Sequence, residues 1–260
     1  DDWDHHFALR VAGNMKYDGL DAAALAARLG VPSCLALERV TSTLDIIHEL
    51  AVEGAPCGAL VLADEQISGR GRQSRRWYSP KGCGVWLSSL KRPSTPVEGG
   101  VLALRTGMAV VRALADLDVV AKIKWPNDVM VHDRKLAGVL CEARWRGPEI
   151  AWVALGIGIN VHGPLPAEIA DRAISLDEVL PGVERLTVLD ALMPWLRDIS
   201  DRPTLDESEC LEFGQCDWLV GRAVRGPVEG TARGIDRSGA LVIETPHGVE
   251  HVVGGNVVPA

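Results

Sequence analysis

A basic segment between residues 66 and 80 constrains the fold more than any other part of the chain. It places four arginines and two glycines close together, namely Gly69, Arg70, Gly71, Arg72, Arg75 and Arg76. Apolar runs typical of buried strands lie on either side, at 59–63 and 85–90. Guanidinium groups this close repel one another unless an anion lies among them, and glycine lets the backbone approach a ligand. We therefore expect a mobile loop between two strands that becomes ordered around an anionic ligand.

The charge of the whole chain bears on the kind of anion. Its 260 residues include 27 Lys and Arg against 35 Asp and Glu, which gives a formal net charge of −8. Such a molecule repels nucleic acid, so the basic segment is a local exception that favours a small anionic ligand. A nucleic-acid-binding module that uses Arg70 to Arg76 remains an alternative, because a basic run on its own fits that function equally well.

Cysteine usage and the N-terminal residues bear on the compartment. Six cysteines occur without any C-x-x-C spacing, at positions 34, 57, 83, 141, 210 and 216. We expect free, mostly buried thiols in a reducing compartment. The first residues lack the features of a signal peptide, and no uncharged apolar stretch approaches the ~20 residues that span a bilayer. The sequence therefore predicts a cytoplasmic protein without a membrane partner.

Periodicity and capping residues predict alternating helices and strands. Helices are expected at 22–29, between a cap at Asp21 and a stop at Gly30, and at 44–51, 101–117, 175–180, 188–199 and 205–213. Thr187 is the expected cap of the fifth, and Arg105 and Arg112 are expected on a solvated face of the third. The main strands are expected at 35–40, 59–63, 85–90, 122–125, 129–131, 135–140 and 150–159.

The chain changes character near Asp217. Short strand patterns at 222–224, 230–233, 240–243 and 249–253 alternate with turns rich in Gly, Pro and Asp. We expect a small β-barrel here.

Several residues have an ordinary structural interpretation. Ser42 and Thr43 stand at a strand-to-helix junction, where they would serve as helix caps. Lys135 opens a strand, which is typical of an exposed edge. The Gly156-Ile157-Gly158 run follows a strand but precedes no helix, so it does not indicate a dinucleotide site.

Five short motifs, taken together, go beyond these interpretations. They are Thr41-Ser42-Thr43, Gln66 with Gly69-Arg70-Gly71-Arg72 and the following Arg75 and Trp77, Lys124-Trp125-Pro126-Asn127-Asp128, Lys135-Leu136-Ala137-Gly138, and Gly156-Ile157-Gly158-Ile159-Asn160-Val161. In this order and spacing the sequence resembles the biotin protein ligases, also called biotin–acetyl-CoA-carboxylase ligases. The resemblance runs from about residue 36 to the end.

The resemblance implies a fold, a domain division and a reaction. The fold is α+β, with a mixed, largely antiparallel sheet and flanking helices as in biotin and lipoyl ligases and class II synthetases, plus a small C-terminal SH3-like β-barrel. Residues 1–35 would form an N-terminal extension with a short helix, 36–213 the catalytic domain and 217–260 the barrel. The reaction would activate biotin with ATP to biotinyl-5′-AMP, then transfer biotin to a lysine of a carboxylase acceptor domain.

The resemblance also implies site residues. Lys135, Arg70 and Arg72 would be catalytic, with Lys135 reaching both the biotin carboxylate and the α-phosphate. The biotin-binding set would be Ser42, Thr43, Gln66, Gly69, Arg70, Arg72, Lys135 and Gly138. The ATP and adenylate set would be Arg72, Arg75, Trp77, Asn127, Lys135 and Asn160, with Trp77 stacking on the adenine side. Mg²⁺ would be held by the ATP phosphates, near Asn127, without a dedicated protein site.

Departures from the family pattern leave some points open. Ser74 stands where the family usually has a third glycine, and serine costs ~1 kcal/mol if the position is left-handed. Only about 35 residues precede the catalytic region, too few for a winged helix, so we expect no DNA binding. The alternative within enzymes is a lipoate or octanoate ligase or transferase. The strand at 150–159 could form the edge of a homodimer or lie buried.

Overall fold

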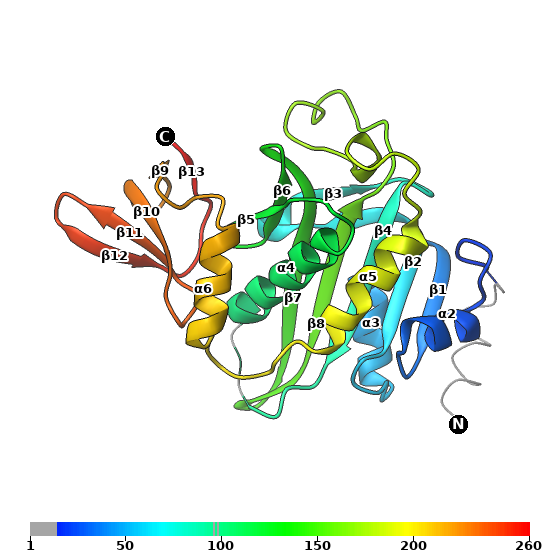
Figure 1. Cartoon of the computed structure of the whole chain (residues 1–260). Helices are drawn as coiled ribbons and strands as arrows, with labels where there is room; N and C mark the ends of the chain where they lie inside the picture. Colours follow the sequence, from blue (N-terminus) through cyan, green and yellow to red (C-terminus); the bar gives the residue numbers. More distant parts are fainter. Residues whose placement is uncertain (1–14, 96, 98) are drawn as a thin grey trace.

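A computed structural model describes residues 15–95, 97 and 99–260 (Figure 1). Within them, the larger of two sheets has the strand order β1-β2-β4-β8-β7-β6-β5, and β3 pairs with β2 outside this path. Its only parallel pair among the described residues is β1 with β2. The strands are β1 (Cys34–Val40), β2 (Leu60–Arg70), β3 (Arg76–Ser79), β4 (Gly84–Lys91), β5 (Lys122–Lys124), β6 (Asp128–Val131), β7 (Arg134–Arg146) and β8 (Glu149–Asn160). The predicted mixed, largely antiparallel sheet is confirmed.

Helices cover both faces of this sheet, because the central strands are apolar on both sides. In β2, Leu60 and Leu62 belong to the core on one face, whereas Val61 and Ala63 belong to the core on the other. On the first face lie α2 (Ala22–Leu29), α4 (Gly99–Ala115) and α5 (Arg185–Arg197). On the second lies α3 (Thr43–Val52), which buries Ile47 and Leu50 completely or nearly so. Figure 1 shows α4 and α5 in front of the sheet and α3 behind it.

The basic segment is a β-hairpin and not the loop that the sequence predicts. Strand β2 continues to Arg70, a 3₁₀ turn spans Arg72–Ser74 (η1), and β3 returns alongside with Gly69 opposite Trp77. We call residues 66–79 the arginine hairpin. Pairing satisfies backbone groups that a loop would leave to water. The sequence gives little warning of these strands, because glycines and arginines interrupt the few strand-favouring residues Ile67, Trp77 and Tyr78.

Capping decides where the helices begin. The predicted helix at 22–29 is confirmed, with Asp21 accepting a bond from the Ala24 amide and Gly30 left-handed. The prediction that Thr187 caps α5 is wrong, since α5 starts at Arg185 after Glu184. Helix α6 (Glu207–Cys216) starts behind Asp206, whose reciprocal bonds with Glu209 form a capping box. A short 3₁₀ helix, η2 (Leu176–Glu178), lies within the predicted helix 175–180.

The C-terminal strands form a separate antiparallel sheet with the order β12-β11-β10-β9-β13. They are β9 (Ala223–Arg225), β10 (Gly230–Ile235), β11 (Leu241–Thr245), β12 (Gly248–Val252) and β13 (Val258–Pro259). The first four confirm the sequence prediction, whereas β13 is too short to leave a pattern. The indole of Trp125 in the larger unit donates to the carbonyl oxygen of Gly239 at 2.9 Å. The domain boundaries at 35/36 and 213/217 stay predictions.

The structure also bears on the predictions about a dimer edge, the cysteines and membrane-spanning segments. Strand β8 pairs with β4 over residues 153–160 and with β7 along its length, so that part of it is interior and offers no dimer edge. The six cysteines are free, as expected, but the expectation that most are buried is wrong: only Cys216 is buried, Cys57 is exposed and the others are half-buried. No helix in the described residues is long and apolar enough to cross a membrane. Residues 1–14 of the predicted N-terminal extension lie outside the described residues.

The expectation that Arg105 faces solvent is wrong. Its side chain is 2% exposed and forms an ion pair with Glu209, with 2.6 Å from Nε to Oε1. It also donates to the carbonyl oxygens of Ser200, Arg202 and Thr204. One buried guanidinium therefore holds the segment between α5 and α6 against α4.

We expect Arg105→Met to lower the free energy of unfolding by roughly 3–5 kcal/mol, because Glu209 would lose its nearest cation in a poorly hydrated place and keep only the more distant Arg202. Urea denaturation measures the change. The matched control is Arg28→Met, which breaks an exposed pair with Asp190 and should leave stability unchanged within error. Equal effects of the two substitutions would contradict the assigned role of Arg105.

Candidate active site

A cavity of about 740 Å³ opens between the arginine hairpin, the N-terminus of α3 and strands β7 and β8. All but Gly69 of the predicted site residues line it: Ser42, Thr43, Gln66, Arg70, Arg72, Arg75, Trp77, Asn127, Lys135, Gly138 and Asn160. They come from four strands, one helix start and two turns. The fold thus brings together residues that are more than a hundred positions apart in sequence.

Two facing glycines form the floor of the cavity. Gly138 on β7 lies directly opposite Gly158 on β8, and the Trp77 indole lies over both. A Cβ at Gly158 would stand 2.4 Å from Trp77 Nε1, and one at Gly138 would stand 2.9 Å from its Cζ3. Side chains at either position would displace the indole. The predicted stacking of Trp77 on an adenine stays a prediction.

The end of the cavity beside α3 is polar and uncharged. Ser42 does cap α3, accepting a bond from the Leu44 amide, and it also lines the cavity. The Gln66 amide oxygen accepts from the Thr43 N–H at 2.9 Å, and its nitrogen donates to the Ser79 hydroxyl at 2.9 Å. One N–H of Gln66 and the hydroxyl proton of Ser42 remain for a ligand.

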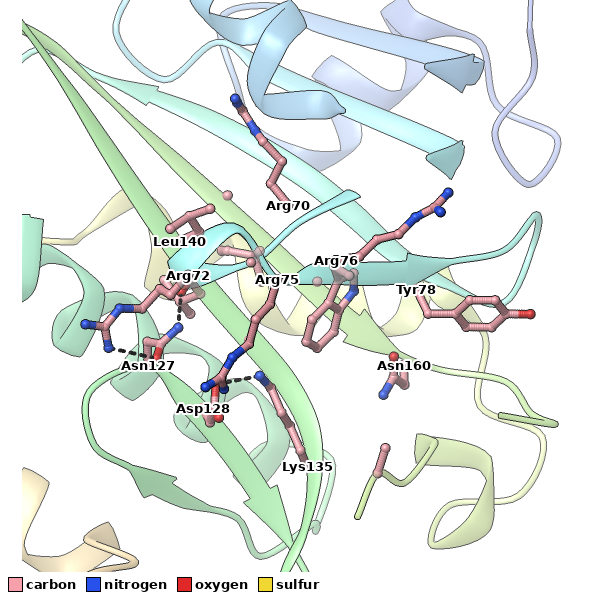
Figure 2. A pocket seen from close by; sticks show the side chains of 18 of the residues that line it. Arg70, Arg72, Arg75, Arg76, Tyr78, Asn127, Asp128, Lys135, Leu140 and Asn160 are labelled. Carbon is pink, nitrogen blue, oxygen red and sulfur yellow. Dashed lines mark hydrogen bonds and ion pairs between the residues drawn. The ribbon is translucent and has the colours of Figure 1, made fainter. Parts of the chain in front are cut away.

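The opposite end is cationic. Lys135 Nζ lies 2.6 Å from Asp128 Oδ1 (Figure 2). It also lies 4.8 Å from the centre of the Trp77 ring. Strand β7 is paired on both sides, so Lys135 does not mark an exposed edge. Arg72 reaches the Asn127 side-chain oxygen at 3.4 Å.

Burial leaves this positive charge poorly compensated. It lowers the pKa of Arg72 and of Lys124 below their ordinary values, against the opposing effect of Asp128. Neighbouring cations, Arg75 for both and Lys135 for Lys124, lower these pKa values further. A partly buried group of cations that share one carboxylate is a site for a multiply charged anion.

The arginines of the hairpin do not converge on one point, as the sequence suggests they would. Arg70 turns away from Lys135 and pairs with Asp45 at 3.1 Å and Glu142 at 3.3 Å (Figure 2). Arg75 bonds Gln73, and Arg76 bonds the carbonyl oxygen of Ile67. Their mutual repulsion is relieved by separate partners and not by a single anion.

The remaining predicted residues have mainly local partners. The Asn127 amide donates to the Val139 carbonyl at 2.7 Å, and the Asn160 amide donates to that of Ile174 at 3.2 Å. Gly69 packs beneath the hairpin, where a Cβ would lie 2.6 Å from the Trp77 carbonyl oxygen. Ser74 has a φ of 58°, so the position that departs from the family's glycine is indeed left-handed.

Sequence reasoning missed part of the cavity wall. Lys124 and Asp128 belong to one of the five motifs, and their charge could have marked them as residues of the anion site. Trp218, Arg172 and Asn256 also line the cavity but come from segments that carry no motif. The centre of the Trp218 ring lies 5.5 Å from Lys124 Nζ and 4.0 Å from Arg222 Cζ. The indole N–H of Trp218 donates to Asp133.

Comparison with known proteins gives the site its context. Residues 36–160 match the Biotin/lipoate A/B protein ligase family, and residues 222–258 match the Biotin protein ligase C terminal domain. The chain is 31% identical to the Biotin--[acetyl-CoA-carboxylase] ligase of Paracoccus denitrificans over 86% of this chain and 97% of that protein. It belongs to the biotin protein ligase family. Membership accounts for both sheets, since the two matched regions coincide with them.

Comparisons with other proteins indicate the same family. The Bifunctional ligase/repressor BirA of Bacillus subtilis (strain 168) is 34% identical, over 84% of this chain and 71% of that protein. Among solved structures, the biotin protein ligase from Aquifex aeolicus in complex with biotin and ATP superposes with a TM-score of 0.75 at 27% identity. That match covers 87% of this chain and 99% of the other.

The charge balance of this biotin protein ligase site can be tested without any substrate. Asp128→Asn removes the carboxylate that raises the pKa of Lys124, so that pKa should fall further. Mass spectrometry of the rate at which acetic anhydride modifies Lys124 as a function of pH measures it. Lys91, whose pKa is also lowered by burial, has no contact with Asp128 and is the internal control. A Lys124 profile that does not move would refute the assigned coupling.

Proposed function

We propose that this chain is an ATP-dependent biotin–protein ligase. In the first step a biotin carboxylate oxygen attacks the α-phosphorus of ATP and the P–O bond between the α- and β-phosphates breaks. The products are biotinyl-5′-AMP and pyrophosphate. In the second, the ε-amine of an acceptor lysine attacks the acyl carbon, AMP leaves, and the amine loses a proton. The observation that carries the proposal is one cavity with a polar, uncharged end at Ser42 and Gln66 and a cationic end at Lys135 and Arg72.

The cationic end reduces the electrostatic repulsion between the two anions that react in the first step. A carboxylate and a phosphate ~4 Å apart repel each other by about 4 kcal/mol in a partly screened site. Lys135 lies where it can offset this repulsion, because its ammonium faces the cavity from the centre of the sheet and is held by Asp128. A substrate carboxylate would take over part of that interaction. Arg72 and Lys124 supply further positive charge for the phosphates.

The uncharged end favours biotin over lipoate or octanoate. A ureido group presents one carbonyl and two N–H groups, for which Ser42, Thr43 and Gln66 offer hydroxyl and amide partners. An acyl chain without such a group would leave the free Gln66 N–H and the Ser42 hydroxyl proton without a ligand partner, which a hydrogen-bonding site disfavours. The alternative of a nucleic-acid-binding module has less support, since Arg70 and Arg76 are engaged by protein oxygens.

Magnesium fits this donor set only as a companion of the nucleotide. The described residues contain no group of three or more His, Cys, Asp or Glu side chains that could hold a metal. Mg²⁺ typically keeps its waters and binds substrate phosphates plus one or two carboxylates. Asp128, with Asn127 beside it, would supply the protein oxygens. The ion would neutralise phosphate charge.

Partners and compartment belong to the same proposal. The acceptor would be the biotin-carrying domain of a biotin-dependent carboxylase, and the free cysteines support a reducing, cytoplasmic setting. The absence of DNA binding and the formation of a homodimer stay predictions.

Isotope exchange between pyrophosphate and ATP tests the proposed function directly. We expect exchange that depends on biotin and that neither lipoate nor octanoate supports. Lys135→Met should reduce it by more than about 100-fold, because a charge that stabilises the reacting atoms is lost. The proposal fails if the folded chain shows no exchange with biotin, or if lipoate replaces biotin.

We further expect Arg72→Met to release biotinyl-5′-AMP about tenfold faster than the unchanged chain, since a cation facing the phosphate is lost. Rapid filtration with labelled biotin measures the release. Arg76→Met removes the same charge from the same hairpin, but Arg76 points away from Lys135 (Figure 2). Faster release from both variants alike would mean that net charge, and not the position of Arg72, retains the adenylate.

A further inference from the structure

A chain of four side chains connects the body of the protein to the arginine hairpin. The Trp152 N–H donates to His48 Nδ1 at 2.9 Å, and His48 Nε2 lies 3.0 Å from Glu142 Oε2. The same Glu142 oxygen is 3.3 Å from the Arg70 guanidinium. We call these four residues the Arg70 tether. They come from β8, α3, β7 and the end of β2, all regular elements of the fold.

The proton positions along the tether are determined by chemistry. An indole N–H can only donate, so His48 Nδ1 must accept, and the proton of a neutral His48 must be on Nε2, directed at Glu142. Glu142 then accepts from both His48 and Arg70. The hydrogen bond from His48, followed by the charge of Arg70, lowers the pKa of Glu142 against the effect of burial. In each polar contact of the tether, a donor therefore faces an acceptor.

The tether holds the hairpin directly beside its tip. Arg70 is the last residue of β2, and Arg72 begins the turn that faces Asn127. Asp45 adds a second contact to Arg70 from α3, the helix whose first residue, Thr43, bonds Gln66 at the other end of the hairpin. Both ends of the β2 arm of the hairpin are thus held by α3, and the tip projects over the cavity.

We propose that Glu142 and His48 are positioning residues that act through Arg70 to hold the arginine hairpin over the cavity. This rests on the proposed function. Neither residue lines the cavity, so neither touches the substrates proposed for it. Loosening Arg70 misplaces the adjoining turn and Arg72, while leaving Lys135 and Gln66 where they are. Because Arg70 turns toward Asp45 and Glu142 and away from Lys135, nucleotide binding and adenylate retention depend on the tether more strongly than biotin binding does.

Glu142→Gln, which keeps the shape and removes the charge, tests this role. In biotin-dependent pyrophosphate exchange, the KM for ATP should rise about tenfold, with kcat and the KM for biotin within about twofold, because only positioning is lost. The matched control is Glu212→Gln, which breaks a half-buried pair with Arg112 far from the hairpin and should leave both KM values unchanged. Equal effects of the two variants would overturn the proposal.

Interruption of the tether at a second point gives an independent check. His48→Phe should raise the KM for ATP as Glu142→Gln does, and the double variant should be no worse than the more affected single variant. Additive effects would show two separate roles and contradict a single chain of contacts.

A third measurement separates the tether from the proposed function. Amide hydrogen exchange at Gly71 and Arg75, which are bonded across the hairpin turn, needs no substrate. It should accelerate in Glu142→Gln and not in Glu212→Gln. Accelerated exchange in a chain that lacks pyrophosphate exchange would sink the function while supporting the tether. Unchanged amide exchange in an active chain would do the reverse.

Discussion

The site depends on two adjacent strands that carry no side chains where they face each other. Gly138 and Gly158 let the Trp77 indole rest against the sheet, and only then can the arginine hairpin lie close over β7 and β8. Any Cβ at Gly158 would meet Trp77 at a distance that real contacts do not reach. The position of Arg72 and the contact between Trp77 and Lys135 follow from this close approach.

Electrostatics acts on this frame in two distinct ways. In the Arg105 network and the Arg70 tether, each charge has a partner, and the result is fixed geometry. At the cationic end of the cavity, Arg72, Lys124 and Lys135 share Asp128, and the result is a demand for anions. The same residue type thus serves structure or ligand binding according to how well its charge is matched nearby.

The sequence predicts most of the main sheet and the cavity residues, because strands with two buried faces and glycine-rich motifs leave strong local patterns. It does not predict the arginine hairpin, since β3 is only four residues long and follows a glycine- and arginine-rich turn that hides the pairing. The exposure expected for Arg105 is wrong because its partners lie about a hundred residues away. The separation of Arg70 from Arg72 is likewise invisible locally, since Asp45, Glu142 and His48 belong to no shared motif. Trp218 and Asn256 are missed for the same reason.

The placement of Trp218 has a consequence for the small C-terminal sheet. This indole precedes that sheet, covers the Lys124 ammonium and is itself fastened to Asp133 in the turn between β6 and β7. The indole covers one side of the Lys124 ammonium, whose pKa is lowered by burial. A chain that ended before Trp218 would leave this side open to water, and solvent would then weaken the attraction of Lys124 for an anion.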